Sequence, residues 1–413
     1  MNNSRLTINC IVLFILLRHI IYYECLDREG YLLPLNKYYK IAIPLLILVL
    51  ISIWGILFFN KTLSTVADNK EEIKPFLDVF FESRGNVLLS GNIKDIEKYY
   101  DTANTYGKWA LEHEMRRINY VKGWSEKRNL KFTEAQSIYR IKSIKVGEQS
   151  IWLYLVETMK MGYEYNVKPN IINYMGLGIR HSIQLVKVDG KWVIRRDWYY
   201  DPLDEDSAFI DISPADGIAP EISPANSTPA GDSQNKKKGN YDREGAVRYA
   251  DTYAGAAWGS GNNYEYNKKY RDYNGVGGDC TNFASQVLHE GGGLKMDYVW
   301  NFNGRDSSTA WAQAPALFNY LIYNGKGRLI AQGTYTNMVK PSDTHPAGAI
   351  RELQKGDLIC YEEKGEIVHF GVVTGFDSYG IPVVNTHTSD RYHVPFDLGW
   401  DKKVIYRFIH IND

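Results

Sequence analysis

Cysteine is scarce in this chain, with four residues among 413, and no two of them form a CxxC pair. Zinc ribbons and disulfide frameworks both need closely spaced or numerous cysteines, so the sequence supports neither. Two of the four, Cys10 and Cys25, belong to the N-terminal segment, which leaves Cys280 and Cys360 for everything that follows. Bacterial proteins that act outside the cytoplasm commonly have this few cysteines.

The chain also lacks a net charge, because 48 Lys and Arg residues balance 48 Asp and Glu residues. Proteins that bind nucleic acid usually carry a basic excess, so the balance excludes an overall attraction of that kind, and we expect no nucleic-acid partner. Aromatic residues make up 14% of the chain, with 31 tyrosines. Such a composition suits folded domains and surfaces that bind sugars or polymers. The length allows two or three domains.

One long stretch has no charge at all. The run from Ile41 to Phe59, IAIPLLILVLISIWGILFF, is long enough to cross the hydrocarbon core, which takes about 20 residues as a helix. Basic residues precede it, so the positive-inside rule predicts a cytoplasmic segment at 1–40 and places the later residues outside. We therefore predict a transmembrane helix at 41–59 and a single-pass protein of the cell membrane, with the cytoplasmic membrane as a partner. Two alternatives stay open: a buried core helix, or a signal peptide cleaved near Thr65-Val66-Ala67 and a secreted protein.

Residues 71–200 have the pattern of one α+β domain. Stretches with helical spacing at about 75–89 and 93–110 come first, and strand-like runs follow, the last two joined by a turn at Asp189-Gly190 and ending in VDGKWVIRRDWYYDP. Helices followed by a curved antiparallel sheet are similar to the cone-shaped nuclear-transport-factor-like fold. Domains of that kind often serve as non-catalytic modules, so we expect an accessory domain that binds a protein partner.

The composition changes again after residue 200. Residues 201–240 are rich in Pro, Ser, Ala, Asp and Gly and carry too little apolar surface to fold, which predicts a flexible linker. From residue 241 the pattern is globular once more, beginning with a helix that Asp242 can cap.

The stretch GGDCTNFASQ places Cys280 where a tight loop enters a helix. Apolar residues at helical spacing begin there and end at Gly291-Gly292-Gly293. The free N–H groups and positive dipole end of a helix favour a thiolate, which suits a nucleophile. Taken alone, Cys280 could equally be a small buried hydrophobe that begins a core helix. Cys360 lies inside a strand-like run and fits the core.

A base for such a nucleophile is His369, in the strand-like run EIVHFGVVTG. Alternation along the strand puts His369 and Gly371 on one face, and the glycine leaves room beside the imidazole. The next strand, PVVNTH, can pair with it antiparallel, and its Asn385 and His387 share one face. Either could accept from the second ring nitrogen of His369, which is the nucleophile, base and orienter arrangement of cysteine hydrolases.

Four motifs, GGDCTNFASQ, LQKGDLICYE, IVHFGVVTG and PVVNTHTSDRYHVPF, together resemble the amidase domain family of Firmicutes. That family belongs to the wider NlpC-type and CHAP-type papain-like cysteine hydrolases. The resemblance covers about residues 241–411. It implies a papain-like α+β domain at 241–413, with a helix packed on an antiparallel sheet.

The resemblance also implies roles for single residues. Cys280 would be the nucleophile, His369 the general base and acid, and His387 or Asn385 the third member. In the related families, backbone N–H groups at the nucleophile and a nearby polar side chain hold the oxyanion. Candidates for that polar side chain, or for substrate contact, are Asp279, Tyr273 and Asn274.

The predicted fold class is therefore α+β, with a transmembrane anchor, a cone-shaped accessory domain and a papain-like hydrolase domain. The predicted function is a membrane-anchored cysteine hydrolase that cuts amide bonds in peptidoglycan or its stem peptides, because an extracytoplasmic bacterial amidase meets that polymer first. A non-catalytic wall-binding or scaffold protein, and a protein-directed protease or acyltransferase, remain as other classes. No metal or other cofactor is expected, since the cluster of His387, Asp390 and His393 has no common zinc spacing.

Overall fold

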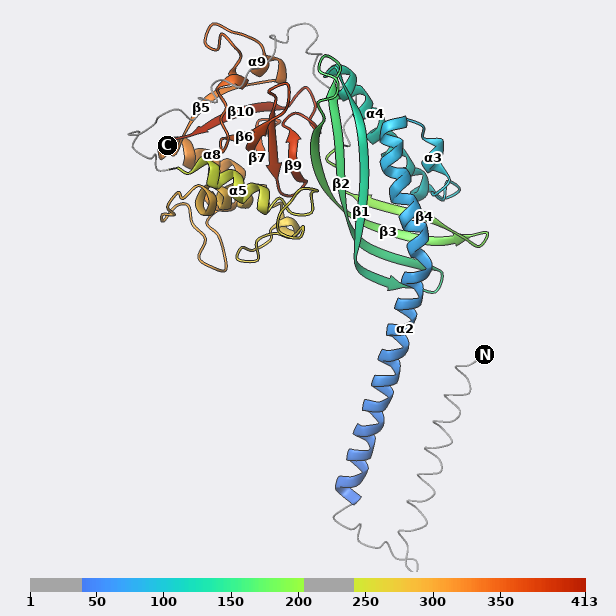
Figure 1. Cartoon of the computed structure of the whole chain (residues 1–413). Coiled ribbons are helices and arrows are strands. Elements are labelled where there is room, and N and C mark those ends of the chain that lie inside the picture. The colour runs from blue at the N-terminus through green and yellow to red at the C-terminus, as the bar shows by residue number, and fades with distance from the viewer. Residues whose placement is uncertain (1–38, 204–240) are drawn as a thin grey trace, which may run out of the picture. The chain divides into compact units, whose positions relative to one another are not determined.

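The computed structural model describes residues 39–203 and 241–413 (Figure 1). Two compact units divide the chain, residues 1–69 and residues 70–413. Nearly all of the predicted N-terminal segment at 1–40, and the predicted linker from residue 204 onward, lie outside the described residues.

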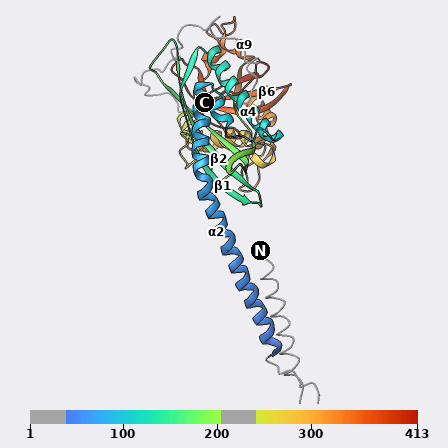
Figure 2. The ribbon, with the colours of Figure 1, turned by 90° about the vertical axis from the view of Figure 1, so that its right-hand side faces the viewer.

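The apolar run at 41–59 lies in helix α2 (Tyr39–Ser90), which is 52 residues long and continuous (Figures 1 and 2). In the part of the chain that the structure describes, no helix combines the length and the apolar character needed to cross a bilayer. The predicted transmembrane helix at 41–59 and the single-pass membrane localisation are therefore wrong. The physical reason is that the apolar run has no helix end of its own, because the same helix continues into charged turns such as Lys70-Glu71-Glu72.

Within residues 70–203 and 241–413, ten strands form one antiparallel sheet, so the mixed α+β character is confirmed. Its first part is a meander, and the turn predicted at Asp189-Gly190 joins its last two strands. The strands of this part are β1 (Leu130–Val146), β2 (Ser150–Tyr165), β3 (Asn173–Val188) and β4 (Lys191–Tyr199). Likeness to the nuclear-transport-factor-like cone stays a prediction.

Strand β3 joins the meander to the rest of the sheet. Its second half, from His181, pairs with β4, whereas Gly176–Gly178 pairs with β9. The order of strands is β1-β2-β3-β9-β8-β7-β6-β10-β5. The remaining strands are β5 (Gly327–Gly333), β6 (Leu358–Glu363), β7 (Glu366–Phe376), β8 (Pro382–Thr386), β9 (Asp390–Pro395) and β10 (Ile405–Ile411).

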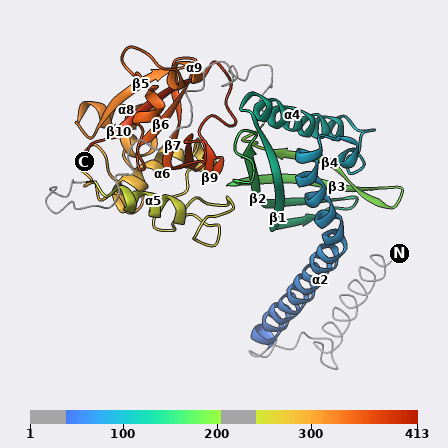
Figure 3. The same cartoon turned by 45° about the horizontal axis from the view of Figure 1, so that its top comes forward.

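Helices cover the meander on one side (Figure 3). The end of α2 supplies buried Leu77 and Phe80, and α4 (Thr105–Lys127) supplies Ile118 and Trp124 to the same core as the strands. The stretch with helical spacing at 93–110 is divided between α3 (Lys94–Glu97) and α4, which begins after Asn104 caps its first turn.

A second core lies between helices and strands β6, β7 and β10 of the C-terminal part. Alternation along β6 decides which core each residue enters: Leu358 and Cys360 face this core, and Ile359 and Tyr361 face the other. The helices of this core are α5 (Arg243–Thr252), which Asp242 caps as predicted, α6 (Cys280–Gln286), a π-helical turn at Val287–Gly291, α7 (Thr309–Ala312) and α8 (Ala314–Tyr323). A 3-10 turn at Asn274–Val276 precedes α6. Helix α9 (Tyr335–Val339) and the 3-10 turn at Ala349–Glu352 pack into the other core.

Candidate active site

Helix α6 begins at Cys280, as the sequence predicts. Gly277 and Gly278 precede it with φ of 124° and 119°, backbone conformations that residues with a Cβ rarely adopt. The Cys280 side chain is buried, and its sulfur accepts a hydrogen bond from the backbone N–H of Phe370 on β7. That N–H is accessible to the sulfur because the pairing of β7 with β8 begins only at Val372. The turn at Gly277-Gly278 and the part of β7 that β8 does not pair with thus bring Cys280 to the strand that carries the predicted base.

The surroundings of Cys280 favour the thiol over the thiolate. Burial raises the pKa of Cys280, and the hydrogen bonds from Phe370 and Thr281 offset only part of that effect. The expectation that the helix start favours a thiolate is therefore not met in this arrangement, because desolvation outweighs the N–H groups. A nucleophilic Cys280 would need a base.

Asp279 fixes the loop from which Cys280 projects. Its carboxylate accepts from the N–H of Tyr273 at 2.9 Å and from the amide of Asn282 at 2.9 Å, and it meets Nδ1 of His387 at 2.6 Å. Its own N–H donates to the hydroxyl of Thr388 at 2.7 Å. Because Asp279 is only 1% exposed, these partners hold the start of α6 without competition from water.

His387 is held on every side by that loop and its neighbours. Its ring stacks on Tyr266 and Phe283, with centroid distances of 3.7 Å and 4.0 Å. Besides the contact with Asp279, its Nε2 donates to the carbonyl of Tyr253 at 2.6 Å. Both nitrogens are therefore engaged away from His369, and the structure gives His387 a positioning place beside Asp279.

Asn385 is likewise turned to other partners. Its amide donates to Asp251 at 2.9 Å, and its oxygen accepts from Thr374 and from the N–H of His393. Cys280 thus meets Phe370, the residue after His369, but Cys280 and His369 do not hydrogen-bond to each other, and neither residue expected as third member hydrogen-bonds to His369 here.

The side-chain hydroxyl of Tyr273 and the side-chain amide of Asn274 also have hydrogen-bond partners already. The Tyr273 hydroxyl donates to Ser307 at 2.9 Å, and the Asn274 amide bonds to Tyr266 and Asp272. The Asp279 carboxylate can only accept while it is ionised. An oxyanion or substrate role for these three residues stays a prediction.

His369 lies on β7 with its ring beside Tyr361 and Trp400, at centroid distances of 5.5 Å and 5.6 Å. Its Nε2 is buried and has no hydrogen-bond partner among the described residues. Burial, and next the positive charge of Arg391, lower the pKa of His369 to about 3. The imidazole is therefore neutral at physiological pH.

A pocket of about 180 Å³ opens beside His369. Its wall includes Trp400, Arg391 and Thr388, and residues Tyr199–Pro202 at the end of β4 complete it. Thr388 is the residue that accepts from the N–H of Asp279, so the pocket lies one contact from the loop that carries Cys280.

The sequence analysis missed Arg391 and the stretch Tyr199–Pro202. No spacing or motif identifies them, because they meet only when β9 and the end of β4 come together in the folded chain. The unusual feature is an arginine that becomes buried on a strand, which a sequence alone does not reveal.

The lowered pKa of His369 predicts a dependence of stability on pH. In an unfolded chain a histidine has a pKa of about 6.5, so between pH 6.5 and the folded value the unfolded state binds the extra proton. The penalty on folding is absent above that window and grows as the pH falls, by up to about 1.4 kcal/mol per unit. Between pH 7 and pH 5, the free energy of unfolding of the native chain, measured with urea, should fall by about 1–2 kcal/mol more than that of the His369→Asn chain. Equal losses in the two proteins would contradict the burial of a neutral imidazole.

Residues 240–409 match the family model described as "Putative amidase domain". Over 184 residues, the chain is 31% identical to "Uncharacterized protein YhbB" of Bacillus subtilis (strain 168). That similarity covers 42% of this chain and 51% of the relative, so the chain spans about half the length of the curated protein it matches. The C-terminal part is therefore similar to an amidase domain, and the reaction that this similarity suggests is hydrolysis of an amide bond. Membership of the NlpC-type and CHAP-type papain-like group stays a prediction.

Proposed function

We propose that residues 240–409 form a cysteine hydrolase of amide bonds, with Cys280 as nucleophile and His369 as general base and acid. The observation that carries this proposal is the hydrogen bond from the Phe370 N–H to the Cys280 sulfur, because Phe370 follows His369 directly on β7. The amidase-family match over 240–409 supports the class of reaction.

The protonation states fit attack assisted by a general base. Cys280 rests as a thiol and His369 as a neutral imidazole, so the proton moves only when the sulfur attacks. The Nε2 atom of His369 is unpartnered among the described residues and can receive that proton. Turning the imidazole from Trp400 toward the sulfur is the side-chain movement that the reaction requires.

The reaction then runs in two halves. The sulfur of Cys280 bonds to the amide carbon while His369 takes the thiol proton, and the first N–H groups of α6 stabilise the oxyanion. A donor of that kind typically contributes about 10²–10³ in rate. His369 returns the proton to the departing amine, which leaves a thioester. Water, deprotonated by His369, hydrolyses the thioester and restores the thiol.

The substrate class that we propose is the peptide part of peptidoglycan. Two aromatic side chains near the pocket, Trp400 and Tyr200, offer ring faces to a polymer made of sugars and peptides, and Tyr200 is 65% exposed. Purified sacculi are the test polymer, and mass spectrometry of the released fragments identifies the bond that is cut.

Selective alkylation tests the role of the thiol. In a chain with Cys10→Ser and Cys25→Ser, the cysteines left are Cys280 and Cys360. Cys360 is 0% exposed inside β6, whereas Cys280 is 8% exposed. We expect iodoacetamide to modify Cys280 first, faster as the pH rises because its pKa is raised.

Release of fragments from sacculi should fall in proportion to Cys280 alkylation measured by peptide mapping, with Cys360 unmodified. An excess of stem peptide should slow both the alkylation of Cys280 and the fall in fragment release. Undiminished release after complete alkylation of Cys280 would refute the proposed mechanism.

A further inference from the structure

Arg391, on β9, is a buried cation in the wall of the pocket beside His369. Its side chain belongs to a residue that is only 3% exposed. One guanidinium nitrogen, Nη1, donates to the carbonyl of Leu398, and Nη2 meets the carbonyl of Pro202 at 3.5 Å, the outer limit of a hydrogen bond. The Nε atom is buried and has no partner among the described residues. The guanidinium is thus held in place while one edge of it stays largely unsatisfied.

The other arginines buried in residues 70–203 and 241–413 differ from Arg391 in having a carboxylate partner. Arg84 pairs with Glu114 and Glu157, Arg117 pairs with Asp201 at 3.0 Å, and Arg128 pairs with Asp397 at 2.6 Å. Over the same described residues, Arg391 forms no ion pair with a carboxylate. Burial lowers the pKa of Arg391, and the neighbouring tyrosine side chains that act against it offset only part of that effect. Burying a charge without a counter-ion costs free energy, so an anion bound next to Arg391 would stabilise this position.

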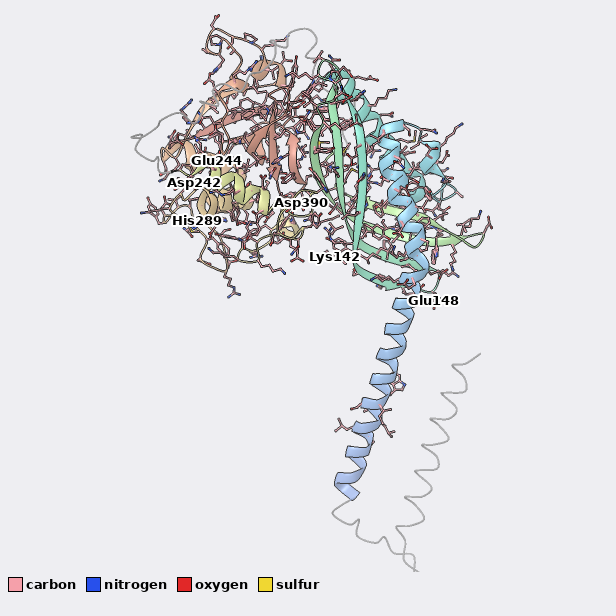
Figure 4. All side chains as sticks on the ribbon, in the orientation of Figure 1. Lys142, Glu148, Asp242, Glu244, His289 and Asp390 are labelled. Carbon is pink, nitrogen blue, oxygen red and sulfur yellow. The ribbon has the colours of Figure 1, made fainter. Side chains whose placement is uncertain are left out.

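The acidic residues at the pocket do not supply that anion. Asp201 is paired with Arg117, and Glu363 is exposed at the rim. Asp390, the residue before Arg391 (labelled in Figure 4), pairs with Arg180 at 2.8 Å and accepts from the N–H of Ala256. The counter-charge for Arg391 therefore has to come from a bound molecule.

The unsatisfied edge has the shape that recognises a carboxylate. Nε and Nη2 lie on the same side of a guanidinium and donate two parallel hydrogen bonds to the two oxygens of one carboxylate. On Arg391 these are the atoms with no partner and with the long contact to Pro202. The hydroxyl of Ser389, which is 5% exposed, lines the same pocket as a further polar group.

We infer that Arg391 binds a carboxylate of the substrate, and that the peptides cut at this site carry a free carboxylate close to the amide that is cleaved. This inference rests on the proposed function, because the same pocket contains His369 and adjoins the Cys280 loop. It narrows the substrate class to peptide acids, in preference to the same peptides with amidated carboxylates.

Binding to a chain that cannot turn over separates this inference from catalysis. The full chain with Cys280→Ala is titrated by calorimetry with N-acetyl-L-alanyl-D-glutamic acid and with the corresponding diamide. We expect the acid to bind at least tenfold more tightly than the diamide. In the double variant with Arg391→Met that ratio should fall to about one, and with Arg391→Lys, which keeps the charge but loses the fork, it should be intermediate.

Arg328→Met, in the Cys280→Ala chain, is the matched control, because Arg328 is an exposed arginine on β5 outside the pocket and its loss changes net charge equally. It should leave the ratio unchanged. Equal binding of acid and diamide by the Cys280→Ala chain overturns the inference, whatever the folding of the Arg391 variants. Hydrolysis of sacculi that persists in Cys280→Ala would instead refute the proposed function and leave the binding ratio as an independent result.

Discussion

Replacing Cys280 with serine or alanine should reduce the release of peptide fragments from sacculi by about four orders of magnitude or more, since removing a nucleophile alone can cost as much as removing a whole catalytic unit. Serine keeps the size and a hydroxyl, but its proton is far harder to remove than that of a thiol. The buried site around Cys280 disfavours an anion even for the thiol, whose pKa is raised. Serine should therefore be no better than alanine here.

The control is Cys360→Ala, which removes the other buried thiol from the second core without touching the pocket. It should lower stability modestly and leave the rate per folded molecule within about tenfold. Binding of the Cys280→Ser chain to sacculi should equal that of the native chain, which separates a hydrolase from a scaffold. Fragment release by Cys280→Ser at the native rate would contradict Cys280 as the nucleophile.

Local sequence signals predicted the parts of this site that depend on local chemistry. The two glycines and the following apolar spacing identified the start of α6 at Cys280, and alternation with β-branched residues identified β7 around His369. Asp242 as the cap of α5 and the turn at Asp189-Gly190 followed from the same kind of reasoning. Each of these features is decided by a few neighbouring residues, so the sequence carries the information in one place.

Contacts between side chains from distant segments could not be predicted from such local signals. Their place in the strand-like run PVVNTH made Asn385 and His387 look like orienters of His369, but stacking on Tyr266 and the carboxylate of Asp279 decide where His387 points. A period-two pattern specifies a face of a strand and not the partner of a side chain.

The same limitation explains the transmembrane prediction. Hydropathy over 41–59 was read without knowing that α2 would continue to Ser90, so a stretch of a longer helix was taken for an element with two ends.

Replacing Arg84 with methionine should lower the free energy of unfolding by about 3–5 kcal/mol, the usual cost of removing one partner from a buried ion pair. Arg84, on α2, donates to Glu114 at 2.8 Å and to Glu157, and all three side chains are fully buried. Glu157 also meets His181 at 3.2 Å. Methionine fills the volume but leaves Glu114 and Glu157 without their shared cation.

The effect of Arg84→Met should depend on pH in a defined direction. Burial acts to raise the pKa of Glu157, but the charge of Arg84 and the contact with His181 outweigh it and lower that pKa below its usual range. A carboxylate of that kind contributes stability above about pH 4.5, and the contribution is lost as the pH falls. The difference between the native chain and Arg84→Met should therefore be largest above about pH 4.5 and shrink as the pH falls below that value.

Lys74→Met is the matched control for urea unfolding, because Lys74 pairs with Asp78 on the same helix α2 but both side chains are exposed. Its loss should change stability by no more than about 1 kcal/mol. The comparison also bears on the pocket, since the Tyr199 hydroxyl donates to Glu114 and Tyr199 begins the stretch that lines the pocket beside His369. An Arg84→Met chain should thus lose the preference for the peptide acid along with stability. Equal stability of the Arg84→Met and Lys74→Met chains would show that the buried charges do not stabilise the wall of the pocket.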